Sequence, residues 1–115
     1  MARQSVCDME FSKVYRALIQ KAERKGRTKE EVDELAEWLC GYSPEQIDEA
    51  LCSDLTYGMF FQNAPAYNPQ ADQIKGKICG IQVETIEDPL MKKIRQFDKL
   101  VDELAKGKPL EKIKR

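Results

Sequence analysis

The chain has 115 residues, of which 42% are hydrophobic and 34% are charged. This length suits one domain with a single core, and the regular spacing of the hydrophobic residues excludes an intrinsically disordered chain. The net charge of -1 and the pI near 5.6 count against a dedicated nucleic-acid-binding protein.

The first two predicted helices are amphipathic. Hydrophobic residues spaced three and four positions apart predict a helix over residues 11–22, which ends before Gly26. Thr28 starts the second helix, because Thr28 and Glu31 have the spacing of a capping box, in which each side chain binds the other residue's backbone N–H. The second helix is expected to end at Gly41.

Two shorter helices are predicted next. Ser43, Pro44 and Gln46 combine a capping box with a proline at the first helical position, which predicts a third helix. Asp54 or Thr56 caps a fourth, which carries four large hydrophobic residues, Tyr57, Met59, Phe60 and Phe61. We expect two of the four to join the core and the others to cover a neighbouring helix. The alternative is a surface for a partner or a dimer.

An irregular segment, residues 64–88, interrupts the helical pattern. Pro65 and Pro69 break helices, and Asn68 before Pro69 is typical of a turn. Alternating polar and β-branched residues allow a short β-hairpin near residues 74–84, turning at Cys79 and Gly80.

The last predicted helix is the longest. Asp88 caps it, Pro89 occupies its first position and Gly107 ends it. The sequence therefore predicts an all-α, compact bundle of four to six short helices in a single domain over residues 1–115, with residues 1–9 and 108–115 as candidates for loosely ordered tails. The expected core is Val14, Leu18, Val32, Leu35, Leu39, Ile47, Leu51, Phe60, Ile94, Phe97, Val101 and Leu104.

The absence of histidine limits the kinds of catalytic and metal-binding site that the chain can form. It removes serine–histidine and cysteine–histidine nucleophilic pairs and every histidine-containing metal site. The cysteines are too widely spaced for a four-cysteine zinc site, so we expect no metal and no cofactor. No hydrophobic run approaches the ~18 residues of a membrane span, and the N-terminus lacks a signal-peptide pattern. We therefore expect a cytoplasmic protein with four free thiols, Cys7, Cys40, Cys52 and Cys79.

Several stretches of the sequence taken together carry a family resemblance. They are Gln20-Lys-Ala-Glu-Arg-Lys-Gly-Arg-Thr28, Trp38-Leu-Cys-Gly-Tyr42, Phe60-Phe61, Ala64-Pro65, Asn68-Pro69, Cys79-Gly80, Val83-Glu84, Ile86-Glu-Asp-Pro-Leu-Met91 and Asp98-Lys-Leu-Val-Asp-Glu-Leu-Ala-Lys-Gly107. With these stretches the chain resembles a bacterial family, domain-of-unknown-function family 2200. The resemblance covers nearly the whole chain. It implies a small, mainly helical bacterial protein with no established activity, and so it assigns no catalytic residue.

Two regions could hold a site. A basic junction between the first two helices contains Arg24, Arg27 and Lys29, beside a helix N-terminus that favours an anion. A solvated face with cations at a helix C-terminus explains the same pattern, and the glutamates that follow would repel an anion.

The second region is the irregular segment 63–88, because long irregular stretches in small domains are often functional. It contains the other four candidate ligand-binding residues, Tyr67, Asn68, Cys79 and Glu84. A carboxylate or the Cys79 thiol could act in catalysis, but no histidine is present to activate the thiol.

These observations favour a non-catalytic cytoplasmic binding or protein-interaction module over an enzyme. The expected partner is a protein, a second copy of the chain or a small ligand, and no membrane is involved. The alternative is a small enzyme, or an anion or nucleic-acid binder, that uses the 63–88 segment or the basic 21–29 junction.

Overall fold

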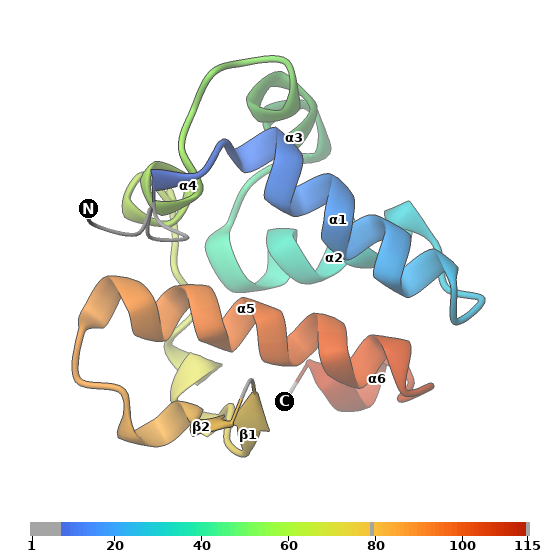
Figure 1. Ribbon diagram of the computed structural model, residues 1–115, viewed down its shortest axis with the longest axis vertical. Helices are drawn as coiled ribbons and strands as arrows, with labels where there is room; N and C mark the ends of the chain where they lie inside the picture. The colour runs from blue at the N-terminus through green and yellow to red at the C-terminus, as the bar shows by residue number, and fades with distance from the viewer. Residues whose placement is uncertain (1–7, 79, 115) are drawn as a thin grey trace.

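The computed structural model of the protein describes residues 8–78 and 80–114. In these residues it shows six α-helices, two 3-10 helices and a two-stranded antiparallel sheet, which confirms the mainly helical fold (Figure 1). The elements in chain order are α1 (Phe11–Glu23), α2 (Lys29–Cys40), α3 (Pro44–Leu51), α4 (Tyr57–Gln62), η2 (Pro69–Gln73), β1 (Lys77–Ile78), β2 (Ile81–Gln82), η3 (Val83–Thr85), α5 (Pro89–Ala105) and α6 (Leu110–Ile113).

Side-chain caps set the starts of four α-helices. Both predicted capping boxes are present: the backbone N–H of Glu31 donates to the Thr28 hydroxyl over 3.2 Å, and that of Gln46 donates to the Ser43 hydroxyl over 3.2 Å. Thr56 caps α4 in the same way, and the Asp88 carboxylate accepts from two backbone N–H groups of α5. Because these bonds satisfy N–H groups that have no partner inside a helix, they fix where each helix begins.

Helix α5 is the centre of the arrangement. Figure 1 shows α1, α2 and α4 along one side of α5, and the sheet of β1 and β2 on the opposite side. The chain leaves α4, passes behind α5 and then forms η2 and the sheet. As a result, α5 has a helical layer on one face and the irregular segment on the other.

One hydrophobic core joins all six helices. Its largest fully buried side chains include six aromatic rings, and these rings pack in a chain in which Phe11 stacks on Phe60 with centroids 4.1 Å apart. Stacked and edge-to-face pairs of this kind add to the free energy of burial. The six rings are Phe11, Tyr15, Tyr57, Phe60, Phe61 and Phe97.

The core differs from the expected one on α1 and α4. On α1, Tyr15 and Ile19 are buried, whereas Val14 and Leu18 are only partly buried at the edge of the core. The stripe is rotated because Tyr15 points inward, where its hydroxyl donates to the Asp33 carboxylate of α2 over 2.6 Å. On α4 the three aromatic side chains of the cluster are buried and its fourth member, Met59, is exposed, so the cluster mainly forms core rather than a free surface.

The hairpin is present but short. Lys77 pairs with Gln82, and Ile78 pairs with Ile81. The small sheet is stable here because Ile78 and the adjoining Val83 bury their side chains in the core, which a hairpin of this size requires.

The C-terminal segment departs from the expected loose tail. Residues 110–113 form α6, Ile113 is fully buried, and Lys114 pairs with the Glu34 carboxylate of α2. A hydrophobic side chain that reaches the core offsets the entropy lost on ordering the segment. Residues 1–7 of the other expected tail lie outside the described part of the chain.

In the part of the chain that the structure describes, no helix combines the length and hydrophobicity that crossing a bilayer demands.

Candidate functional site

A cavity of about 250 Å³ lies between η2 and the first two turns of α5. Tyr67 and the segment that follows form one wall, and α5 forms the other. Prolines and an alanine give the walls a hydrophobic part, and lysine, aspartate, amide and phenol groups give them a polar part. The lining residues are Tyr67, Asn68, Pro69, Ala71, Asp72, Pro89, Lys92, Lys93 and Gln96.

A chain of hydrogen bonds connects the two walls. The Tyr67 hydroxyl donates to the side-chain oxygen of Gln96, and the Gln96 amide donates to the carbonyl of Ala71 over 3.1 Å. Gln96 is only 3% exposed, so both of its polar atoms need these partners. Burial raises the pKa of Tyr67 well above its ordinary value, so the phenol stays protonated and keeps donating to Gln96.

The end of α2 holds the wall that carries Tyr67. The backbone N–H groups of Ala66 and Asn68 donate to the carbonyls of Cys40 and Leu39, over 3.1 and 2.8 Å. The Asn68 side chain donates to the carbonyl of Trp38 over 3.1 Å and accepts from a backbone N–H of η2. These bonds satisfy carbonyls that the last turn of a helix leaves without partners.

Gly41 allows this contact. It is left-handed, with φ of 82°, and a Cβ there would lie 2.8 Å from the Cβ of Ala66 and 3.0 Å from its backbone nitrogen and oxygen. The chain can therefore bring residues 66–68 against the end of α2 only with glycine at position 41.

Two of the seven candidate residues, Tyr67 and Asn68, lie together in the cavity. Glu84 lies in η3, is exposed, and accepts a hydrogen bond from the backbone of Gly76 over 3.2 Å. It does not line the cavity. Cys79 lies outside the described residues.

The basic junction lies apart from the cavity, and carboxylates already bind two of its three candidates. Arg27 donates to the Glu31 carboxylate over 2.6 and 3.1 Å, and this pairing holds the pKa of Glu31 below its usual range. Lys29 contacts Asp33 at 2.6 Å and Asp48 at 3.4 Å.

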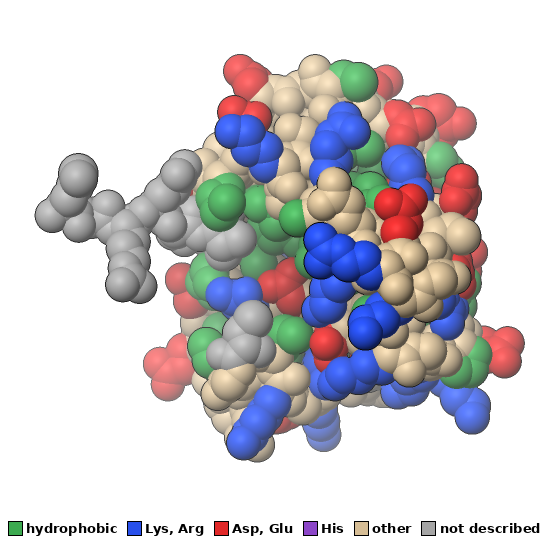
Figure 2. Space-filling model, turned by 45° about the vertical axis from the view of Figure 1, so that its right-hand side comes forward, with side chains coloured by type: hydrophobic (Ala, Val, Ile, Leu, Met, Phe, Trp, Pro, Cys, Tyr) green, Lys and Arg blue, Asp and Glu red, His purple; other side chains and the backbone are tan. Residues whose placement is uncertain are grey.

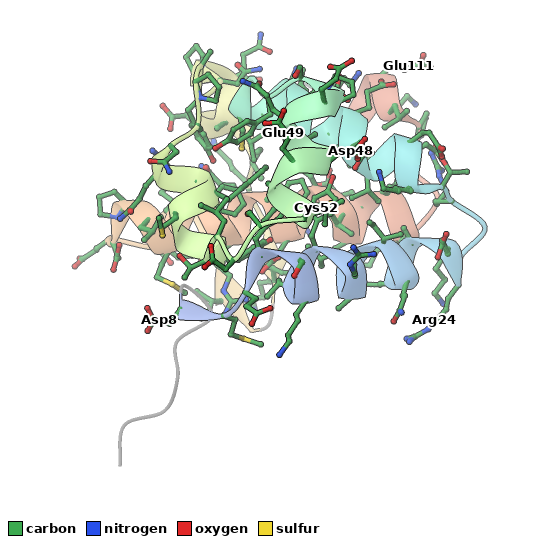
Figure 3. All side chains as sticks on the ribbon, turned by 90° about the horizontal axis from the view of Figure 1, so that it is seen from above. Asp8, Arg24, Asp48, Glu49, Cys52 and Glu111 are labelled. Carbon is green, nitrogen blue, oxygen red and sulfur yellow. The ribbon has the colours of Figure 1, made fainter. Side chains whose placement is uncertain are left out.

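Arg24, the third candidate at the junction, is exposed at the end of α1 and points away from the rest of the molecule (Figure 3). It borders a hollow that is also lined by Gln20 and Glu23. The three junction candidates therefore do not converge on one point.

The described cysteines are free thiols with opposite environments. Cys40 is buried, and burial raises the pKa of its thiol to about 12. Cys52 is exposed at the end of α3 (Figure 3). Neither lines the cavity.

Sequence reasoning missed the α5 wall of the cavity, because the last helix was judged only by its hydrophobic stripe. Lys92, Lys93 and Gln96 follow one another at a spacing that places them on one side of a helix. Gln96 is the stronger signal, since an amide beside buried Phe97 on an amphipathic helix needs polar partners.

Comparison with known proteins gives a family but no activity. No curated protein matches the chain. A solved structure described as "Crystal structure of uncharacterized protein SP1917" is 48% identical, with a TM-score of 0.92, and the match covers 97% of this chain and 92% of that one. Residues 5–115 match the family described as "Uncharacterized protein conserved in bacteria (DUF2200)". The chain therefore belongs to the DUF2200 family, as its sequence motifs indicate.

Proposed function

We propose that the protein is a non-catalytic binding module whose ligand is a small molecule held in the cavity between η2 and α5. The observation that supports this most directly is the Tyr67–Gln96–Ala71 chain of hydrogen bonds, which holds the two walls in a fixed relation. A site with preformed walls loses little conformational entropy when it binds a ligand.

The size of the cavity favours a small ligand. About 250 Å³ is just below the range typical of sites for drug-sized molecules. The mixture of hydrophobic walls and a few polar groups is also typical of ligand sites. A metabolite with a short carbon skeleton and one or two polar groups fits this description.

The chemistry of the lining residues supports binding rather than catalysis. The Tyr67 phenol stays protonated, so it cannot act as a base near neutral pH. The amides of Asn68 and Gln96 are already hydrogen-bonded within the protein. No cysteine, serine or threonine is among the described residues that line the cavity, so the described lining offers no thiol or hydroxyl nucleophile other than the phenol.

Nuclear magnetic resonance on the ¹⁵N-labelled protein tests the proposal. Mixtures of organic acids, amino acids, phosphate esters and amines are added at millimolar concentration, and backbone amide shifts are followed. We expect at least one compound to shift the backbone N–H signals of residues 67, 68, 70–72 and 90–96 together. Shifts confined to other regions, or none from any mixture, would contradict the proposal.

A matched pair of variants locates the binding. Asp72→Trp places a large ring at an exposed position of the cavity lining, whereas Asp54→Trp makes the same change at an exposed position that does not line it. We expect the first variant to lose binding and the second to keep it. Equal binding by both would show that the compound occupies another site.

A further inference from the structure

Two lysines at the cavity differ from the lysines near the C-terminal end of α5. Lys99 of α5 and Lys106, the residue that follows the helix, both pair with the Asp102 carboxylate, at 3.8 and 3.1 Å. Lys92 and Lys93 line the cavity and are half-buried, and no carboxylate among residues 8–78 and 80–114 lies within ion-pairing distance of either one. Two cations without a carboxylate partner therefore border the cavity.

Lys93 is nevertheless held in place. Its ammonium group lies over the Tyr67 ring, 4.8 Å from the ring centroid. A cation above an aromatic face is attracted to it but keeps its full charge, so it can still attract an anion. Because Gln96 fixes the Tyr67 hydroxyl, the ring and the ammonium group above it are oriented before any ligand binds.

The charge distribution around the cavity suits a ligand with one anionic group rather than several. Asp72, on the opposite wall, is exposed and reduces the local excess to one positive charge. Independently of the cavity, Figure 2 shows a face of the molecule on which lysine and arginine side chains gather in the central and lower part and most acidic side chains lie nearer the edges. A polyanion would extend to Asp72 and be repelled by its carboxylate, whereas a single carboxylate or phosphate group could contact the lysines alone.

We infer that the cavity recognises a small organic anion, whose charged group lies between Lys92 and Lys93 and whose carbon skeleton lies against Pro69, Ala71 and Pro89. This inference rests on the proposed binding function. The lysine side chains hold the anion, because the Asp88 carboxylate already accepts from the N–H groups of Leu90 and Met91 at the start of α5. A carboxylate and a phosphate monoester share this chemistry.

Pairs of probes that differ in charge but not in shape test the inference. Benzoate and benzamide form one pair, acetate and acetamide form a smaller one, and phenyl phosphate represents the phosphate esters. Each is titrated into the ¹⁵N-labelled full chain at low salt. We expect each carboxylate probe to shift the backbone N–H signals of residues 67, 68, 70–72 and 90–96. It should also bind at least about fivefold more tightly than the neutral compound of its pair, which is the factor that a partly screened charge pair contributes.

Lysine variants test whether Lys92 and Lys93 bind the anionic group of the probe. Lys92→Gln and Lys93→Gln should each weaken binding of the anion about fivefold and leave binding of the neutral amide unchanged. Lys25→Gln, which removes a cation from the exposed loop after α1, is the matched control and should change neither. Tighter binding of phenyl phosphate than of benzoate would identify the anionic group as a phosphate ester.

The outcomes separate the inference from the proposed function. If benzamide and acetamide bind at the cavity as tightly as benzoate and acetate, the anion inference is overturned and the proposed binding function is supported. If the anions bind but the lysine variants bind them unchanged, the inference is also overturned. If no probe and no metabolite shifts the backbone N–H signals of the cavity walls, the anion inference and the proposed binding function are both overturned.

Discussion

Replacing Gly41 with alanine should destabilise the protein far more than the same change at another left-handed glycine. Gly41 has φ of 82°, and an added Cβ would lie 2.8 Å from the Cβ of Ala66. Left-handed backbone costs an alanine roughly 1–2 kcal/mol. Forcing the Ala66 backbone away adds roughly 1–3 kcal/mol, as overpacking generally does. We expect a loss of about 3 kcal/mol in the free energy of unfolding.

Gly26→Ala is the matched control. Gly26 has nearly the same φ, 79°, but a Cβ there would meet nothing within 4 Å. It should therefore lose only the backbone contribution, about 1 kcal/mol. For a chain of this length, 1 kcal/mol corresponds to roughly 4 °C in the midpoint of thermal unfolding.

Circular dichroism during heating and urea titration measure both variants. We expect the midpoint to fall by about 12 °C in Gly41→Ala and about 4 °C in Gly26→Ala. Because the displaced backbone carries the wall of the cavity, Gly41→Ala should also weaken ligand binding, and Gly26→Ala should not. Equal losses of stability in the two variants would refute the argument from close approach.

Three further predictions concern burial. Burial raises the pKa of all four tyrosines, that of Tyr42 to about 12. Because folding favours the protonated phenols, it gains a stabilisation that is complete below pH 10, the ordinary pKa of tyrosine. This stabilisation is lost as the pH rises through the raised pKa values. Absorbance at 295 nm should therefore show the phenolates appearing together with unfolding above pH 10, and a gradual rise centred on pH 10 would contradict this. Ile113→Ala should lower the free energy of unfolding by about 3 kcal/mol, because the side chain is fully buried; a change below about 1 kcal/mol in urea titration would show that α6 contributes little. A thiol reagent followed by peptide mass mapping should modify Cys52 in the native protein and Cys40 only after unfolding; equal rates would contradict the burial of Cys40.

Local signals in the sequence predicted much of the fold. The capping residues Thr28, Ser43 and Asp88 each act within a few positions of the chain, so spacing alone identifies them. The rotation of α1 could not be predicted in this way. It depends on the hydrogen bond from Tyr15 to Asp33, which joins residues 18 positions apart in sequence.

The same distinction between local and long-range contacts holds for the candidate site. Tyr67 was expected because the irregular segment is visible in the sequence, but its partner Gln96 lies 29 residues further along the chain. The α6 helix was missed for a related reason, since nothing local to Ile113 indicates that the core has room for it. Contacts between distant segments decide such features, and a single sequence does not display them.

The attachment of residues 66–68 to the end of α2 makes hydrogen–deuterium exchange informative about the cavity. The Ala66 and Asn68 backbone N–H groups donate to carbonyls at the end of α2 that have no partner within the helix, so breaking these two bonds removes no hydrogen bond from within α2. We therefore expect deuterium uptake at these two N–H groups to report local opening of the cavity wall rather than global unfolding. A ligand that binds only the closed wall slows that uptake in proportion to its occupancy. The exchange rate thus measures affinity for any compound, with no label on the ligand.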